Sequence, residues 1–432
     1  MITILIVVFL VLLLVGLPIA FCMGIGSFLA LAVHMPQAVV TIIAKMFGGL
    51  DSFSLMAVPF FILAGNLMDA SGISRKLVRF AELLVGRIKG GLSMAGVVSG
   101  VIFAGVSGSA SADTSAIAAI LVPPMTDEGY EKGWSSCLIA TTGMLGPIIP
   151  PSILAILYSA ATGLSVGALF MSGVIPGLLI AAGLLFLCAR YAKTHPKISQ
   201  AAETRERVGF KAGMMIFLGV LPALLMPVII IGGILTGVFT ATESAAIACI
   251  YAILYGMISR RLSLKKMWDC LGESAVTIAK LMLIVCLATL FGWILSVNNF
   301  PVMVRDALLS VSSNSYVIML LVLALLLFVG CFMETIAALT ILVPVLAPIA
   351  VAYNINSIHF AMFMIIALLI GGITPPVGIN LYITTSVAKI RFSESLKYLM
   401  PFLLISLVAV LAVLFIPALT TLIPSWLGYI TH

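Results

Sequence analysis

Charged side chains are scarce in this chain. Lys, Arg, Asp and Glu together make up 9% of the 432 residues, whereas soluble domains carry roughly 25%. Hydrophobic residues make up 62% of the sequence, and the mean hydropathy is +1.29. This composition excludes a soluble globular domain. It predicts an all-α polytopic membrane protein, because apolar windows of about 20 residues recur along the whole sequence.

Basic residues are missing from the first thirty positions, MITILIVVFLVLLLVGLPIAFCMGIGSFLA. A secretory leader starts with a basic region and has a short apolar core. This segment lacks such a region and is too long for such a core. We therefore expect a first transmembrane helix over 2–33 instead of a cleaved leader.

Histidine is rare, and the cysteines follow no metal-binding spacing. The four histidines are His34, His195, His359 and His432, and none has a partner spaced for a metal site or a catalytic triad. The seven cysteines lie mostly in apolar segments. We expect them to be small buried side chains, with neither a disulfide framework nor a zinc site.

Long apolar runs dominate the sequence. We expect helical spans near 2–33, 53–72, 135–163, 165–189, 213–233, 237–259, 274–297, 359–388 and 398–423. Two further stretches, 92–125 and 316–352, are too long for one helix and are interrupted by polar or glycine residues. Each of these two either crosses the membrane twice or dips in and returns as a re-entrant hairpin.

Clusters of basic residues decide between these two alternatives. They lie at 75–91, 190–211, 260–266 and 389–397. The positive-inside rule assigns all four clusters to the cytoplasm. The number of membrane crossings between the clusters places all four on the cytoplasmic side only if 92–125 and 316–352 are re-entrant hairpins. The first hairpin then opens from the cytoplasm and the second from the outside.

An internal repeat supports two related halves. DTSAIAAILVP (113–123) aligns without gaps to ETIAALTILVP (334–344), with six of eleven positions identical, and this alignment pairs Asp113 with Glu334. GPIIPPS (146–152) and GITPPVG (372–378) share a double proline. The basic loop 75–91 corresponds to 298–315, where Arg305 is balanced by Asp306. Opposite charge bias in equivalent loops predicts an inverted repeat, with the span 213–233 linking the halves.

Four polar breaks interrupt the apolar runs. They are VSGSASAD (106–113), GMLGPIIPPS (143–152), VGCFMET (329–335) and GGITPPVGIN (371–380). Broken backbone at membrane depth is tolerated only where it is buried in protein or lines a wet cavity. Carbonyl and hydroxyl oxygens at such breaks suit Na⁺, and free N–H groups at half-helix N-termini suit a carboxylate.

Each of these features also has a purely structural interpretation. The small residues could serve close helix packing, and the double prolines could be kinks instead of unwound segments. Asp113 could cap the second hairpin helix, attract an ion, or do both, and Glu334 could do the same in the other half. Glu243 follows Thr240 and Thr242 at a helix start, where it could cap the helix or have a functional role.

These motifs resemble a known family. SGSASADTSAIAAILVPPM, GPIIPPS, GCFMETIAALTILVP and GGITPPVGINLY are similar to the large membrane subunit of tripartite ATP-independent periplasmic (TRAP) transporters, over almost the full chain. The resemblance implies multi-pass location in the bacterial inner membrane and uptake of organic acids, such as sialic acids or C4-dicarboxylates, driven by a Na⁺ gradient. It also implies two partners: a periplasmic substrate-binding protein and a small four-helix membrane subunit, expected as a separate chain.

The resemblance also assigns site residues. It implies at least two Na⁺ ions and no other metal or organic cofactor. The first Na⁺ site would use Ser107, Gly108, Ser109, Asp113, Gly143 and Gly146. The second would use Gly330, Glu334, Thr335, Gly372, Thr374 and Gly378. The substrate would lie between the hairpin tips, near Ser107, Ser109, Ser111, Pro150 and Asn380.

The resemblance further implies an elevator mechanism, in which a transport domain slides against a fixed scaffold. The first inverted repeat would be 1–195, followed by a linker and connecting span over 196–236 and a second repeat over 237–432. Both hairpins and both interrupted helices (135–163 and 359–388) would form the transport domain, and outer spans the scaffold. The amphipathic stretch 74–89 would be an arm helix at the cytoplasmic surface, its basic side chains facing anionic lipid.

Three other functions compete with this assignment. A stand-alone Na⁺/organic-anion symporter of the same design is the closest. An intramembrane serine protease is suggested by GVSG (105–108), but a nucleophilic Ser107 needs a histidine in reach, and His359 is predicted at the outer end of its span. A channel needs a continuous wet path, whereas hairpins that end in mid-membrane favour alternating access. We therefore expect a transporter and not an enzyme.

Overall fold

The computed structural model describes residues 1–199 and 209–429, and this part of the chain is helical throughout, with short connections. His432 and the middle of the expected 196–236 linker, with its Arg205 and Arg207, lie outside the described residues. The first half contains α1 (Ile2–Leu14), α2 (Ile19–His34), η1 (Pro36–Thr41), α3 (Ile42–Leu50), η2 (Ser54–Met56), α4 (Ala57–Ala70), α5 (Ile73–Val85), α6 (Gly91–Ser107), α7 (Ala110–Asp127), α8 (Lys132–Gly143), α9 (Ile153–Thr162), α10 (Val166–Ser172) and α11 (Val174–Thr194).

The second half follows the connecting helix α13 (Phe210–Leu235). It contains α14 (Ala241–Ile258), α15 (Leu264–Val297), α16 (Phe300–Val311), α17 (Ser315–Phe332), α18 (Thr335–Ala352), α19 (Ser357–Gly371), α20 (Ile379–Ala388), α21 (Phe392–Phe415) and α22 (Ala418–Trp426). Within the described ranges, seven helices are long and apolar enough to cross a membrane. The expected all-α multi-pass fold is confirmed.

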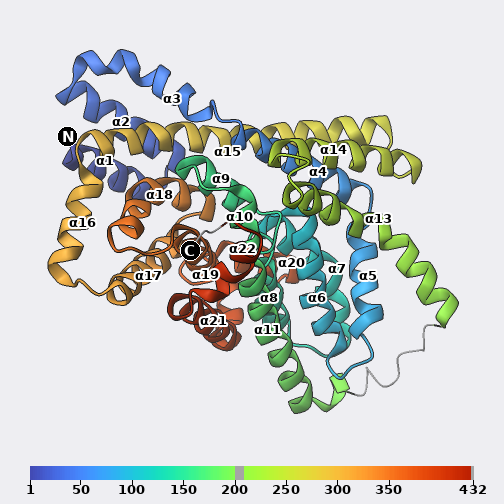
Figure 1. The fold of residues 1–432 in the computed structure, drawn as a ribbon. Helices are drawn as coiled ribbons and strands as arrows, with labels where there is room; N and C mark the ends of the chain where they lie inside the picture. Colours follow the sequence, from blue (N-terminus) through green and yellow to red (C-terminus); the bar gives the residue numbers. More distant parts are fainter. Residues whose placement is uncertain (200–208, 430–432) are drawn as a thin grey trace.

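The expectation of one helix over 2–33 is wrong. The chain turns at Gly16, which has φ +89°, and Pro18 occupies the N-cap position of α2. α1 and α2 then pack against each other (Figure 1). A long apolar run shows no sign of such a turn in its hydropathy, because both short helices are apolar on all sides.

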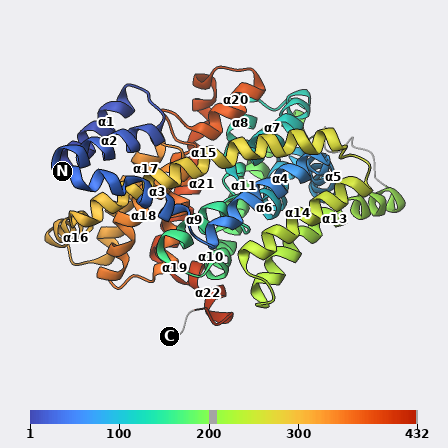
Figure 2. The same ribbon diagram turned by 90° about the horizontal axis from the view of Figure 1, so that it is seen from above.

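One long helix, α15, crosses most of the molecule. Figures 1 and 2 both show it running from the side of α1 and α2 to the side of α5. It contacts α2, α3, α4 and α18. α4 in turn packs along α14. The helices α2, α3, α4, α14 and α15 form a continuous framework beside the hairpins.

Both expected hairpins are present, and each lies beside an interrupted helix. α6 and α7 form the first hairpin and pack on α8, while α17 and α18 form the second and pack on α19. The second parts of the interrupted helices are exchanged between the halves: α9 packs on α18, and α20 packs on α7 and α8. All four breaks therefore lie in one connected region.

The repeat has a different register from the one that the sequence alignment gives. α7 and α18 are both 18 residues long and begin at Ala110 and Thr335, an offset of 225 residues. The double prolines have the same offset, and the Pro150–Pro151 and Pro375–Pro376 peptide bonds are both cis. The ungapped alignment at offset 221 is therefore one helical turn out of register, and the position equivalent to Glu334 is Ser109, not Asp113.

The arm helix predicted over 74–89 is present as α5. Its Leu77 and Val78 are buried, while Arg75 and Arg79 are exposed. The corresponding stretch 298–315, expected to be a loop, contains the helix α16. Pro301 lies in the first turn of α16, a position where proline favours helix formation.

Candidate functional site

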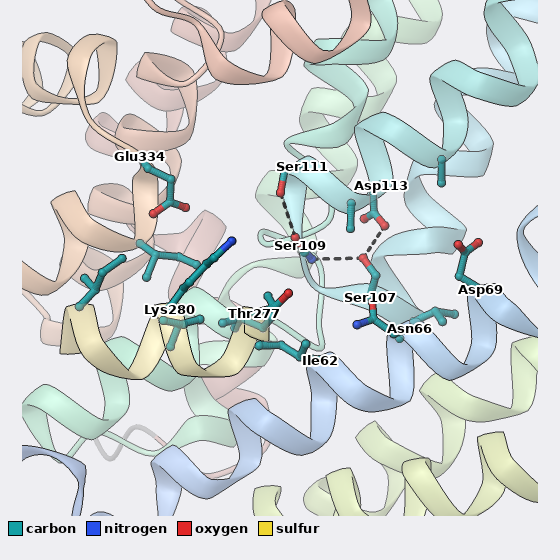
Figure 3. A pocket seen from close by; sticks show the side chains of 18 of the residues that line it. Ile62, Asn66, Asp69, Ser107, Ser109, Ser111, Asp113, Thr277, Lys280 and Glu334 are labelled. Carbon is teal, nitrogen blue, oxygen red and sulfur yellow. Dashed lines mark hydrogen bonds between the residues drawn. The ribbon is translucent and has the colours of Figure 1, made fainter. Parts of the chain in front are cut away.

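A cavity of about 900 Å³ lies between the framework helices and the two hairpin tips. Side chains from α2, α4, α5 and α15 form one part of its wall, and the end of α6 with the first residues of α7 and α18 forms the other. Figure 3 shows the polar part of this wall. Five of the predicted site residues line it together: Ser107, Ser109, Ser111, Asp113 and Glu334.

The first tip is a two-residue connection between α6 and α7. Gly108 has φ +62°, in the left-handed region, and a Cβ at this position would overlap the carbonyl oxygen of Pro151. Only glycine fits such a position without strain. Ser109 is extended and occupies the N-cap position of α7, without a capping bond from its side chain. The tip is thus held against the break between α8 and α9.

Asp113 lies one turn inside α7 and is 1% exposed. The Ser107 hydroxyl donates a hydrogen bond to Asp113 Oδ1, and the Ser109 amide donates to the Ser107 Oγ at 3.2 Å. Asp113 Oδ2 has no hydrogen-bond partner among the described residues, and Asp113 makes no capping bond to α7. A buried carboxylate with a free oxygen is costly unless a cation or donor occupies the adjoining space.

Two glycines of the α8 break let the backbone approach these side-chain oxygens closely. A Cβ at Gly146 would overlap Asp113 Oδ2, and one at Gly143 would overlap the hydroxyl of Thr114. Thr114 Oγ1 is also buried without a partner among the described residues. The orphaned atoms here are oxygens, and hard cations are bound by oxygen ligands. The residues present therefore fit a Na⁺ ion between α7 and the α8 break.

The second tip uses its carboxylate differently. Glu334 is the N-cap of α18, and the Ala337 amide donates to Glu334 Oε2 at 3.2 Å. This side chain is half-buried and points into the cavity (Figure 3). The amide of Val377 donates to the carbonyl oxygen of Cys331 at 3.3 Å, so the second tip binds the break between α19 and α20.

The other predicted residues surround the tips and do not line the cavity. Gly330 packs directly on Gly371. Gly372 lies near the Thr335 hydroxyl, and Thr374 Oγ1 donates to the carbonyl oxygen of Ile370 at 2.7 Å. Gly378 begins α20 with φ +52°, while Pro150 and Asn380 are buried. Direct contact of Pro150 or Asn380 with a substrate stays a prediction.

Sequence reasoning missed five polar residues of the cavity wall: Asn66, Asp69, Ser74, Thr277 and Lys280. The Asn66 side chain donates to Ser274 Oγ at 2.9 Å, joining α4 to α15, and Ser74 donates to Asp69. Lys280 lies within a span predicted from hydropathy alone. Inserting an ionised side chain at the centre of a membrane helix costs roughly 2.5–3.5 kcal/mol. A single lysine in an apolar run is therefore the sequence feature that could have identified this residue.

The site does not support the serine-protease alternative. Ser107 Oγ is hydrogen-bonded to a carboxylate, and no histidine is among the described residues that line the cavity. His359 is buried elsewhere, with Nδ1 2.8 Å from Thr420 Oγ1. A hydroxyl donor that is already paired with Asp113 and lacks a nearby base is not an activated nucleophile.

Glu243 is a structural cap. The Thr240 hydroxyl accepts from the Glu243 amide at 3.2 Å, and Glu243 Oε2 accepts from the Thr240 amide at 2.8 Å. This reciprocal pair is a capping box at the start of α14. It lies outside the cavity.

Comparison with known proteins gives a consistent result. Residues 6–419 match the family described as "Tripartite ATP-independent periplasmic transporter, DctM component". The chain is 38% identical to the sialic acid TRAP transporter large permease protein SiaM of Vibrio cholerae, over 97% of each chain. It is 35% identical to the C4-dicarboxylate TRAP transporter large permease protein DctM of Pseudomonas aeruginosa, over 94% of each.

A solved structure also shares the fold. The YdaH transporter of Alcanivorax borkumensis superposes with a TM-score of 0.62, over 92% of this chain and 90% of that one, at 15% sequence identity. At this identity the likeness concerns the fold alone.

Proposed function

Because this chain belongs to the DctM family of TRAP transporters, whose members are permeases and not enzymes, we propose that it transports a small organic acid across the bacterial inner membrane together with Na⁺. The observation that supports Na⁺ coupling is the buried carboxylate of Asp113. Its free oxygen adjoins Gly146 and lies at the hairpin tip that lines the cavity. A bound cation would offset this charge and tie the tip to the α8 break.

The second predicted ion site has weaker support. Glu334 supplies one oxygen to the α18 amides, and its remaining oxygen is available to an ion or to the cavity. We place the first Na⁺ at Asp113 and keep Glu334, Thr335 and Gly372 as ligands of a second.

The relatives and the cavity support an organic acid as the substrate. The named relatives transport sialic acid and C4-dicarboxylates, which are both carboxylates. Ser109 and Ser111 present hydroxyls to the cavity, 3.5 Å apart, and can bind polar groups of either substrate. A volume of about 900 Å³ accommodates either molecule.

We propose alternating access by an elevator movement. The two hairpins and two interrupted helices exchange contacts with each other and would move as one body against α4 and α15. The cavity reaches Ser74 and Leu77 on α5, next to the basic cluster 75–91. With that cluster in the cytoplasm, the cavity opens inward. The exposed Arg75 and Arg79 of the arm helix would face anionic lipid.

The proposed partners are a periplasmic substrate-binding protein and a small membrane subunit. α13 has a broad exposed apolar face that includes Phe210, Met215, Leu218 and Val228. A membrane partner or lipid would cover it. A stand-alone symporter remains the alternative and makes a different prediction about the periplasmic protein.

Proteoliposome transport tests this proposal. The chain is reconstituted with its small subunit, and uptake of radiolabelled N-acetylneuraminate and succinate is followed with an inward Na⁺ or choline gradient. We expect uptake of one probe only with Na⁺ and only with the periplasmic protein. Equal uptake in choline would contradict Na⁺ coupling, and full uptake without the periplasmic protein would favour the stand-alone symporter.

A further inference from the structure

Lys280 lies on the face of α15 that lines the cavity. Thr277, Lys280 and Ile284 follow the spacing of one helix face, and all three contribute to the cavity wall. Figure 3 shows the lysine side chain reaching from α15 toward the space between Glu334 and the first tip. Lys280 is the only basic side chain among the described residues that line the cavity.

The Lys280 ammonium has no partner within the ranges that the structure describes. Three carboxylates share its cavity, but each is held by a donor of its own surroundings. Ser74 donates to Asp69, Ser107 donates to Asp113, and the Ala337 amide donates to Glu334. No salt bridge or hydrogen bond joins any of them to Lys280 in the described residues. An unpaired ammonium in a membrane-spanning helix is rare and marks a functional site.

We propose that Lys280 binds the carboxylate of the transported organic acid and selects anions over neutral molecules. The proposal rests on the organic-acid transport proposed above and identifies the residue that recognises the acid group. The ammonium supplies three donors and no acceptor, so the matching group on a ligand is an acceptor with negative charge. Ser109 and Ser111, on the opposite wall, face the rest of the ligand.

The position of the Lys280 ammonium is consistent with binding an organic anion. The tips already contain Asp113 and Glu334, and these carboxylates would repel an organic anion. A fixed ammonium on α15 offsets that repulsion from the framework side of the cavity. Once one Na⁺ neutralises Asp113 and a second neutralises Glu334, the Lys280 ammonium balances the Asp69 carboxylate, and the cavity no longer repels an organic anion. Substrate affinity and Na⁺ affinity then depend on different residues.

Direct binding measurements on charge variants test the proposal. The purified chain with its small subunit is titrated calorimetrically with N-acetylneuraminate and with succinate, in NaCl and in choline chloride. The variants are Lys280→Gln, Lys280→Arg and, as a matched control, Lys45→Gln. Lys45 lies over the ring of Trp293, 5.1 Å from its centroid, and does not line the cavity.

We expect Lys280→Gln to raise the Kd of the bound carboxylate about 10- to 100-fold, the factor of one charge-assisted hydrogen bond. Lys280→Arg should stay within about threefold of wild type because it keeps the charge. Lys45→Gln should be unchanged, and the Na⁺ concentration for half-saturation, measured by titrating NaCl without the acid, should be the same in all variants. A merely structural lysine would change both affinities or neither.

A Lys280→Gln protein that binds the carboxylate with the wild-type Kd would overturn the proposal. So would a wild-type protein that binds neither probe in either salt. Loss of Na⁺ dependence in the wild type, with the Lys280 effect intact, would instead overturn Na⁺ coupling alone. Thermal unfolding of each variant separates a loss of binding from a loss of fold.

Discussion

The two hairpin tips have the same architecture and place their carboxylates differently. Each tip joins two helices and leads into a helix of 18 residues. In the first tip Ser109 occupies the N-cap position without a side-chain capping bond, and the buried carboxylate of Asp113 lies one turn further on, with an oxygen that has no partner among the described residues. In the second the cap is Glu334 itself, and its carboxylate accepts from α18. A shift of one helical turn therefore separates a candidate ion ligand from a helix cap.

The largest effect should come from filling the space beside Asp113. Gly146→Ala would place a Cβ against Asp113 Oδ2, whereas a Cβ at Gly372 would meet Leu369 O at 3.2 Å and the Thr335 hydroxyl at 3.7 Å. We expect Gly146→Ala to weaken the apparent Na⁺ affinity of uptake about 100-fold, the upper end of the range for residues that orient a metal ligand. Gly372→Ala should change it less than threefold. Equal effects of the two substitutions would contradict the difference between the tips.

A smaller effect is expected from Ser107→Ala. This change removes the hydroxyl that links the Ser109 amide to Asp113 Oδ1 but leaves the carboxylate in place. The apparent Na⁺ affinity of uptake should fall about tenfold, with the maximal rate nearly unchanged. Ser111→Ala is the control, because Ser111 lines the same cavity without a bond to Asp113. An unaltered Ser107→Ala affinity would argue against its role in orienting Asp113.

The smallest effect should come from the second tip. Glu334→Ala removes a helix cap, which typically costs about 1 kcal/mol of stability, and thermal unfolding in detergent should show a lower midpoint. Glu334→Gln keeps an oxygen that can accept from the Ala337 amide and should unfold close to wild type. If Glu334→Gln is as unstable as Glu334→Ala, the capping role is wrong and the charge itself is needed.

The hairpins and the breaks could be predicted from the sequence because polar and charged residues mark them in an apolar chain. Three serines, a glycine and an aspartate at 106–113 stand out in an apolar run, and the basic clusters constrain how often the chain crosses the membrane. The register of the repeat was predicted one turn out, because a slip of four residues preserves helical periodicity. Pro344 and Pro348 lie four residues apart. Pro123 therefore aligns with Pro344 at the offset of 221 and with Pro348 at the offset of 225.

Other features could not be predicted from local patterns. The turn at Gly16 lies inside an uninterrupted apolar run, so hydropathy gives one span where the chain forms two helices. The free oxygen of Asp113 depends on its distance from Gly146, a contact between α7 and a segment more than thirty residues away. Lys280 and Asp69 come from separate spans, and only the folded chain brings them to the same cavity as the tips.

Direct binding of radioactive sodium to purified protein tests the central claim, that Asp113 and not Glu334 is the tip carboxylate available to the first cation. Wild type, Asp113→Asn and Glu334→Gln are compared by equilibrium dialysis, with folding checked by thermal unfolding. We predict that Asp113→Asn weakens the tighter Na⁺ site about 100-fold, whereas Glu334→Gln leaves that site unchanged. Wild-type affinity in Asp113→Asn, or an equal loss in Glu334→Gln, would contradict the account.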